Sequence, residues 1–156
     1  MNLLSWFHWL GHSAVGLYMQ RSTWAFAVVE TVHLIALAAL GGAVLAIQLT
    51  SLGVIRRIRL ARLAAGLFPV VIGSLAVLVV TGLLMVSEES LKCYYSHAFR
   101  AKMLALAFAI VVFIPLHAIQ TRDISEAVPW WLRVGAATSL LLWLSVGLAG
   151  RAIGFL

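Results

Sequence analysis

Residues 24–40 read WAFAVVETVHLIALAAL, and this stretch decides the fold class of the chain. The apolar run continues to residue 50, and Glu30 and His33 are its only ionisable side chains. About 20 such residues in a helix cross the roughly 30 Å hydrocarbon core of a bilayer. An ionisable side chain inside that core costs about 2–3 kcal/mol or more, so it needs a partner, a ligand or water. Because a spacing of three places Glu30 and His33 on one helix face, we expect a shared counter-charge, cofactor or metal opposite them.

The composition of the whole chain is typical of a membrane protein. Its 156 residues are 63% hydrophobic and 10% charged, and the mean hydropathy is +1.07. A soluble domain could not hide that much apolar surface from water. Alternating apolar and polar residues are absent, so helices are the expected spanning elements. We therefore predict an all-α integral membrane protein, a four-helix transmembrane bundle with spans near residues 24–50, 67–86, 101–120 and 131–150.

The first 20 residues differ from the rest of the chain. They are apolar but broken by histidine, glycine and serine, and they contain Trp6 and Trp9. Aromatic rings of this kind prefer the headgroup level of a bilayer. We predict an interfacial amphipathic helix over residues 1–20, followed by one four-helix transmembrane domain over residues 21–156. Ser22 or Thr23 is expected to cap the first span, and Pro69 is expected in the first turn of the second span.

The basic charge indicates a membrane topology rather than nucleic acid as a partner. The net charge is +6, but the arginines lie at the ends of the spans. Positive residues are retained on the cytoplasmic side of a membrane. Four arginines occupy the first connection, which is therefore expected to be cytoplasmic: Arg56, Arg57, Arg59 and Arg62. Both termini and residues 87–100 would then lie on the outer side.

The five histidines make a b-type haem the first cofactor to consider. Such a haem is held between two imidazoles at similar depth on neighbouring helices. With the mid-plane near Leu37 and Ile110, a rise of about 1.5 Å per residue puts His33 about 6 Å to the outer side and His117 about 10 Å to the inner side. His97 falls at or beyond the outer boundary. Neither His97 nor His117 is level with His33, although a tilted helix could close several ångströms.

Other polar residues fit more than one role. Arg100 and Lys102 could meet haem propionates, pair with Glu30, or extend to the headgroups as ordinary cations at a span end. His8 and His12, four residues apart, could chelate a divalent metal or serve as interface residues. A di-metal bundle needs acidic residues on several helices, and the other spans contain no buried carboxylate. The sequence also contains no nucleophile–base–acid set, phosphate loop or cysteine cluster, so stand-alone catalysis has no support.

Several short motifs resemble an uncharacterised family of small four-helix bacterial inner-membrane proteins. They are residues 22–26 (STWAF), 29–34 (VETVHL), 41–42 (GG), 98–104 (AFRAKML) and the late His117. Such proteins look distantly similar to cytochrome b561-like and copper-resistance-D-like membrane domains. The resemblance implies a bacterial inner membrane and haem or copper handling near the outer face. With the arginine distribution, it places both termini in the periplasm. The chain departs from the family pattern at His97, where Asn-Pro is expected before Ala-Phe-Arg.

The sequence therefore leaves three candidate functions. The first is a haem b electron-transfer subunit between the quinone pool and a periplasmic redox partner, with His33 as one axial ligand, His97 or His117 as the other, and Arg100 and Lys102 at the propionates. The second is a non-catalytic accessory subunit that packs against other membrane subunits. The third is the handling of copper or another metal through a set of four residues: His8, His12, Glu30 and His33.

Overall fold

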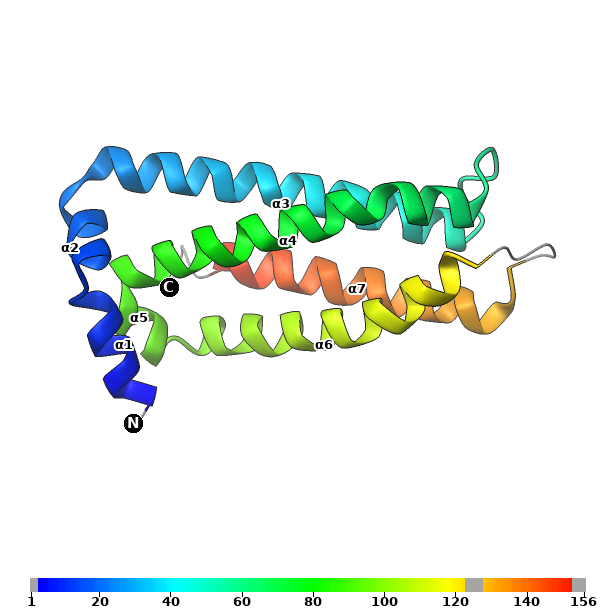
Figure 1. Ribbon diagram of the computed structural model, residues 1–156. Helices are drawn as coiled ribbons and strands as arrows, with labels where there is room; N and C mark the ends of the chain where they lie inside the picture. The colour runs from blue at the N-terminus through cyan, green and yellow to red at the C-terminus, as the bar shows by residue number, and fades with distance from the viewer. Residues whose placement is uncertain (1–2, 123–127, 153–156) are drawn as a thin grey trace.

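The computed structural model describes residues 3–122 and 128–152 (Figure 1). The described residues form helices and no strands. Three helices are short: α1 (Leu3–Gly11), α2 (Ala14–Arg21) and α5 (Ser90–Tyr95). Four are long: α3 (Thr23–Ser51), α4 (Leu60–Glu88), α6 (His97–Gln120) and α7 (Trp130–Ala152). Each long helix is apolar and long enough to cross a membrane, which confirms the predicted all-α, multi-pass fold class.

Two span boundaries differ from the prediction. Helix α4 begins at Leu60, seven residues before the expected start, and continues past residue 86 to Glu88. Pro69 therefore lies in the third turn of α4, and the prediction that it occupies the first turn is wrong. At that position a proline removes the hydrogen bond to the carbonyl of Ala65. Helix α6 begins at His97 because the Ser96 hydroxyl accepts a hydrogen bond from Phe99 N at 3.2 Å.

The N-terminal segment forms two helices rather than the single helix predicted over residues 1–20. The Ser13 hydroxyl caps α2 by accepting from Gly16 N at 3.1 Å. Gly16 permits a close approach to α1, since a Cβ atom there would lie 2.6 Å from the Leu10 carbonyl oxygen. Both helices run steeply across one end of the bundle (Figure 1). Ser22 then caps α3, accepting from Ala25 N at 3.2 Å, as the sequence indicated for one of two residues.

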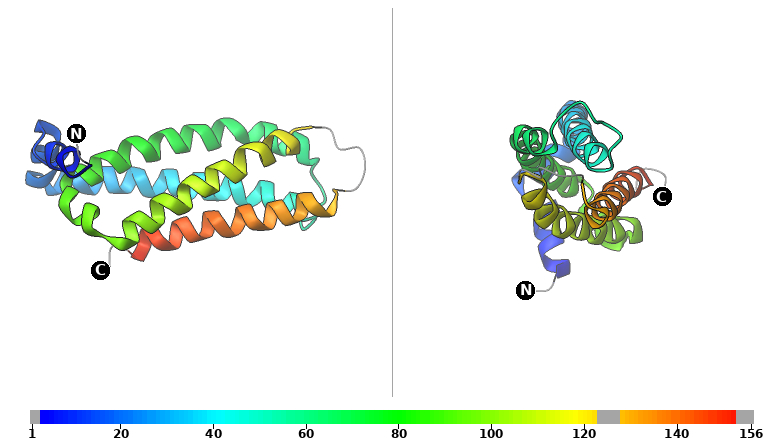
Figure 2. Two further views of the ribbon diagram at one scale, coloured as in Figure 1. Left: turned by 90° about the horizontal axis from the view of Figure 1, so that it is seen from below. Right: turned by 90° about the vertical axis from the view of Figure 1, so that its right-hand side faces the viewer.

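The long helices form two antiparallel pairs, α3 with α4 and α6 with α7 (Figure 2). We call the end that carries α1, α2 and α5 the capped end. The opposite end contains the connection between α3 and α4, and we call it the arginine-rich end after its exposed Arg56, Arg57, Arg59 and Arg62. Because α3 and α6 both run away from the capped end, residue numbers rise in the same direction along these two helices (Figure 1).

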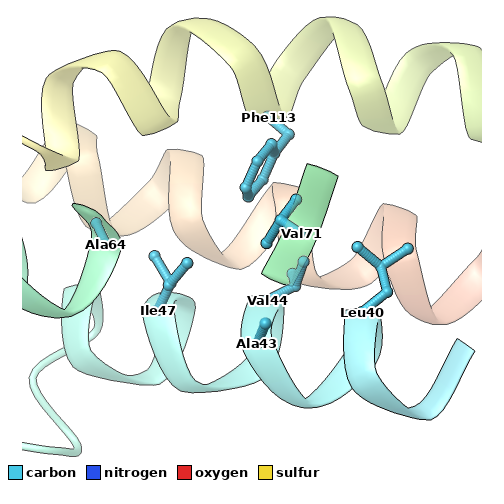
Figure 3. Close-up of a cluster of buried hydrophobic side chains, with 7 residues drawn as sticks. All are labelled: Leu40, Ala43, Val44, Ile47, Ala64, Val71 and Phe113. Carbon is cyan, nitrogen blue, oxygen red and sulfur yellow. The ribbon is translucent and has the colours of Figure 1, made fainter. Parts of the chain in front are cut away.

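The apolar core lies in the half of the bundle nearer the arginine-rich end. Phe113 of α6 points toward Val71 of α4 and toward side chains of α3 (Figure 3). The whole cluster comprises Leu40, Ala43, Val44, Ile47, Ala64, Val71 and Phe113. By contrast, α3 has no buried residue before Ala36, and α6 has none before Ala109, among the residues described. In the capped half α3 and α6 diverge (Figure 1), and the buried side chains there come from the other helices: Phe7, Met19, Thr81, Ser87, Ser90 and Val146.

Two phenylalanines on α6 provide a test of this core. Phe113 is 4% exposed and Phe108 is 61% exposed. Lipid is as apolar as a protein core, so truncation in a membrane protein costs mainly the lost packing contacts. We expect Phe113→Ala to lower the free energy of unfolding by about 2 kcal/mol or more, and Phe108→Ala by less than about 1 kcal/mol. Unfolding in mixed micelles measures both, and equal losses would contradict the assignment of the core.

Candidate functional site

His33 is held by a directed hydrogen bond in the capped half of the bundle. Its Nδ1 atom lies 2.7 Å from the hydroxyl oxygen of Thr81 on α4. The Thr81 hydroxyl donates its own hydrogen to the Val77 carbonyl, also at 2.7 Å. A hydroxyl has only one hydrogen to give, so at His33 it must accept, and Nδ1 must be protonated. The neutral imidazole then presents Nε2 with a free lone pair, the form in which histidine binds a metal ion.

The surroundings of His33 come from all four long helices. A Cβ atom on Gly82 of α4 would lie 3.6 Å from Cε1 of the imidazole. Lys102 of α6 lies within electrostatic range of the His33 ring. Its Nζ atom would be 3.4 Å from a Cβ atom on Gly150 of α7, so the ammonium group lies against that helix. We call His33, Thr81 and Lys102 the His33 site.

Cys93 of α5 adjoins this site. The thiol is half-buried, unoxidised, and within electrostatic range of Lys102. Burial raises the pKa of the Cys93 thiol, and the neighbouring Glu89 carboxylate raises it further. A thiol with a raised pKa is a poor nucleophile near neutral pH, because the thiolate is the reactive form.

Glu30 does not share the environment of His33. Its side chain is exposed on the outer surface of α3, whereas His33 is half-buried and bonded to Thr81. Glu30 makes no hydrogen bond or ion pair with any residue that the structure describes, including Arg100 and Lys102. The predicted common partner of Glu30 and His33 is therefore wrong within the described chain.

His97 and Arg100, two further candidate ligands at the capped end, are exposed. His97 is exposed at the first residue of α6. Arg100 is also exposed, donates to the Tyr94 carbonyl at 3.1 Å, and lies 5.5 Å from the centre of the Tyr94 ring. Arg100 is therefore bound to α5, while Lys102 is the cation that faces His33.

His8 of α1 and His12, the residue after the end of that helix, lie together, as their spacing predicted. Their rings stack with centroids 6.0 Å apart, and both side chains are exposed. Nδ1 of His12 lies 2.9 Å from the His8 carbonyl oxygen and so donates to it, which leaves Nε2 available. Over residues 3–122 and 128–152, no group of three or more potential metal ligands comes together. His8, His12, Glu30 and His33 therefore do not form one four-residue site.

His117 lies far from His33 along the bundle. The Gln120 amide donates to Gln48 Oε1 at 2.9 Å, so residue 120 of α6 is level with residue 48 of α3. His117 is then level with about residue 45, roughly 18 Å from His33 at 1.5 Å per residue. One iron cannot bind both imidazoles, and the pairing of His33 with His117 is wrong. His117 instead stacks between Phe68 and Phe113, with ring centroids 4.6 and 5.3 Å away.

A second set of polar side chains occupies the arginine-rich half, and sequence reasoning did not identify it. Gln120 donates to both Gln48 and Ser51, the latter at 2.7 Å, and Gln48 donates to Ser139 at 3.2 Å. All four side chains are fully buried. We call them the amide cluster: Gln48, Ser51, Gln120 and Ser139. The sequence could have indicated this cluster, because each of two apolar spans contains a glutamine near its end.

The comparison with known proteins places the chain in a family. Residues 5–156 match a family of unknown function (DUF6644), and the chain belongs to that family. No curated protein and no solved structure matches it. The family match agrees with the predicted membership of an uncharacterised family.

The reactivity of Cys93 tests its environment. We expect maleimide labelling of Cys93 to rise with pH along a curve displaced upward from that of an exposed cysteine, because the thiolate forms at a higher pH. Glu89→Gln removes a carboxylate that raises this pKa. The curve of the variant should therefore move back toward lower pH. A wild-type curve that coincides with that of a free thiol would contradict the described burial of Cys93.

Proposed function

We propose that the chain is a membrane-embedded subunit that binds a b-type haem in its capped half. In this proposal the haem carries electrons between the quinone pool and a redox partner on the periplasmic side. The arginine-rich end faces the cytoplasm of a bacterium, and both termini lie on the periplasmic side of the inner membrane. We also propose that the chain is distantly related to cytochrome b561-like and copper-resistance-D-like membrane domains.

The hydrogen-bond chain from His33 through Thr81 to Val77 is the observation that carries this proposal, because it favours the tautomer with a free Nε2. A histidine that binds a metal usually donates its second ring N–H to an acceptor, which sets the orientation of the ring. The Thr81 hydroxyl provides that acceptor at 2.7 Å, and its own hydrogen is committed to Val77. His33 Nε2 is thus prepared to bind iron without any change of tautomer.

The residues around His33 fit part of a haem site. Lys102 is a half-buried cation on the far side of the bundle interior, where it could pair with a propionate. His97 is the remaining imidazole on a spanning helix at the same end, five residues before Lys102. A haem bound here would supply one-electron transfer.

Optical spectroscopy tests the cofactor directly. The protein is produced with haem supplementation, purified in mild detergent, and recorded as a reduced-minus-oxidised difference spectrum. We expect an α-band of the b type, and a loss of haem content of about tenfold or more in His33→Ala. His12→Ala removes an exposed histidine at the same end and should retain the haem. A wild-type protein without an α-band would contradict the proposal, and full haem content in His33→Ala would contradict the ligand.

Thr81 provides a second test, which distinguishes a role of its hydroxyl in haem binding from a purely structural role. Thr81→Val has nearly the same shape but cannot accept the hydrogen bond from His33 Nδ1. We expect its haem affinity to fall by about tenfold, as for other partners of metal-binding histidines, while Thr81→Ser keeps the affinity near that of the wild type. Haem titration and the midpoint potential measure the effect. Equal affinities in the valine and serine variants would contradict a role for the hydroxyl.

The second candidate is an accessory subunit of a larger membrane complex, and Glu30 is the observation that favours it. The carboxylate is exposed on the surface of α3 and has no partner among the described residues. A charge in that position gains from a cation or hydrogen-bond donor on a neighbouring subunit. Co-purification of stoichiometric partners that are lost in Glu30→Gln, together with an absent α-band, would favour this candidate over the haem protein.

A further inference from the structure

Three buried polar side-chain atoms among the described residues have no hydrogen-bond partner: Trp143 Nε1 on α7 and two atoms near the end of α6. The two atoms on α6 are Nδ1 of His117 and Oε1 of Gln120. The His117 side chain is 7% exposed, and that of Gln120 is 0% exposed. An unpaired buried polar group costs about 1–3 kcal/mol, so such groups are rare and require an explanation.

The amide of Gln120 leaves one side unpartnered whichever way it is oriented. As described, its two N–H groups donate to Gln48 and Ser51, and Oε1 is left without a donor. Exchanging nitrogen and oxygen in both glutamines would keep them bonded to each other. The free side of Gln120 would then carry N–H groups in place of the carbonyl oxygen. A group that satisfies either form must both donate and accept hydrogen bonds.

The amide cluster lies close to the aqueous phase at the arginine-rich end. Gln120 and Ser51 are the last residues of α6 and α3. His117 is one turn further into the bundle, on the interior side of the same helix. Beyond it, the apolar core around Phe113 and Val71 closes the interior toward the capped end (Figure 3). The unpartnered atoms of Gln120 and His117 therefore lie within about one helical turn of the end of α6 at the arginine-rich end.

We propose that these groups line a polar inlet that binds water, and that this water bridges Gln120 and His117 and connects the His117 imidazole to the aqueous phase at the arginine-rich end. Water is the ligand that both donates and accepts, and a buried water typically takes about three hydrogen bonds from polar groups of this kind. The hydroxyls of Ser51 and Ser139 supply further partners within the cluster. The site is separate from the His33 site, and the proposal does not depend on haem.

Nitrogen-15 NMR of the histidine rings tests the inlet. The protein is labelled at histidine, placed in lipid nanodiscs, and examined for magnetisation transfer from water to each imidazole. His117 is identified by the signal that disappears in His117→Phe. We expect His117 to receive magnetisation from water in the wild type, and Gln120→Leu to reduce the transfer at least fivefold. Gln20→Leu removes a glutamine at the capped end and should leave it unchanged.

Ser51 provides a second test of the same proposal. Ser51→Ala is a smaller change that removes one hydroxyl of the cluster, and we expect it to reduce the transfer about twofold. If Gln120→Leu does not fold, the wild-type measurement and Ser51→Ala decide. A wild-type His117 without transfer from water would overturn the proposal. The proposal would also be overturned if the variants that fold showed the same transfer from water to His117 as the wild type, within experimental error.

Discussion

A polar side chain that a helix carries into the bilayer gains from a partner inside the protein, because lipid offers none. This constraint accounts for both polar sites. His33 donates to Thr81, and Thr81 passes its hydrogen to a carbonyl of its own helix. At the other end, Gln48 and Gln120 join α3 to α6, and Gln48 also reaches Ser139 on α7. The bundle is thus held in register by a few hydrogen bonds placed within apolar surroundings.

The two halves of the bundle differ in packing, and the difference matches the chemistry of their sites. Near the arginine-rich end, Phe113 and Val71 fill the interior, and the fully buried amide cluster lies toward the ends of α3 and α6. In the capped half, α3 and α6 diverge, and His33 and Lys102 remain only partly buried. A half-buried imidazole with a free lone pair is suited to bind a cofactor, while the fully buried amides are suited to hold water.

The fold class could be predicted from local properties. Span length and hydropathy depend on about 20 consecutive residues, which a sequence displays directly. The pairing of Glu30 with His33 failed for a geometric reason. Residues three apart on a helix point about 60° from each other, so one can face the interior while the other faces outward. The start of α4 was also missed, because residues 60–66 mix arginine with apolar residues and Pro69 indicated a start close to itself.

The sequence by itself determined that this chain spans a membrane as helices and that an imidazole lies within the first span. The partner of each polar side chain was decided only by the tertiary structure. Thr81 is 48 residues from His33, and Gln120 is 72 residues from Gln48. Neither distance leaves a periodic signal in the chain, since such pairs meet only when the rotation and relative height of separate helices are set. The rotation and relative height of the helices depend on side-chain packing between them. The hydropathy of a single helix does not determine that packing.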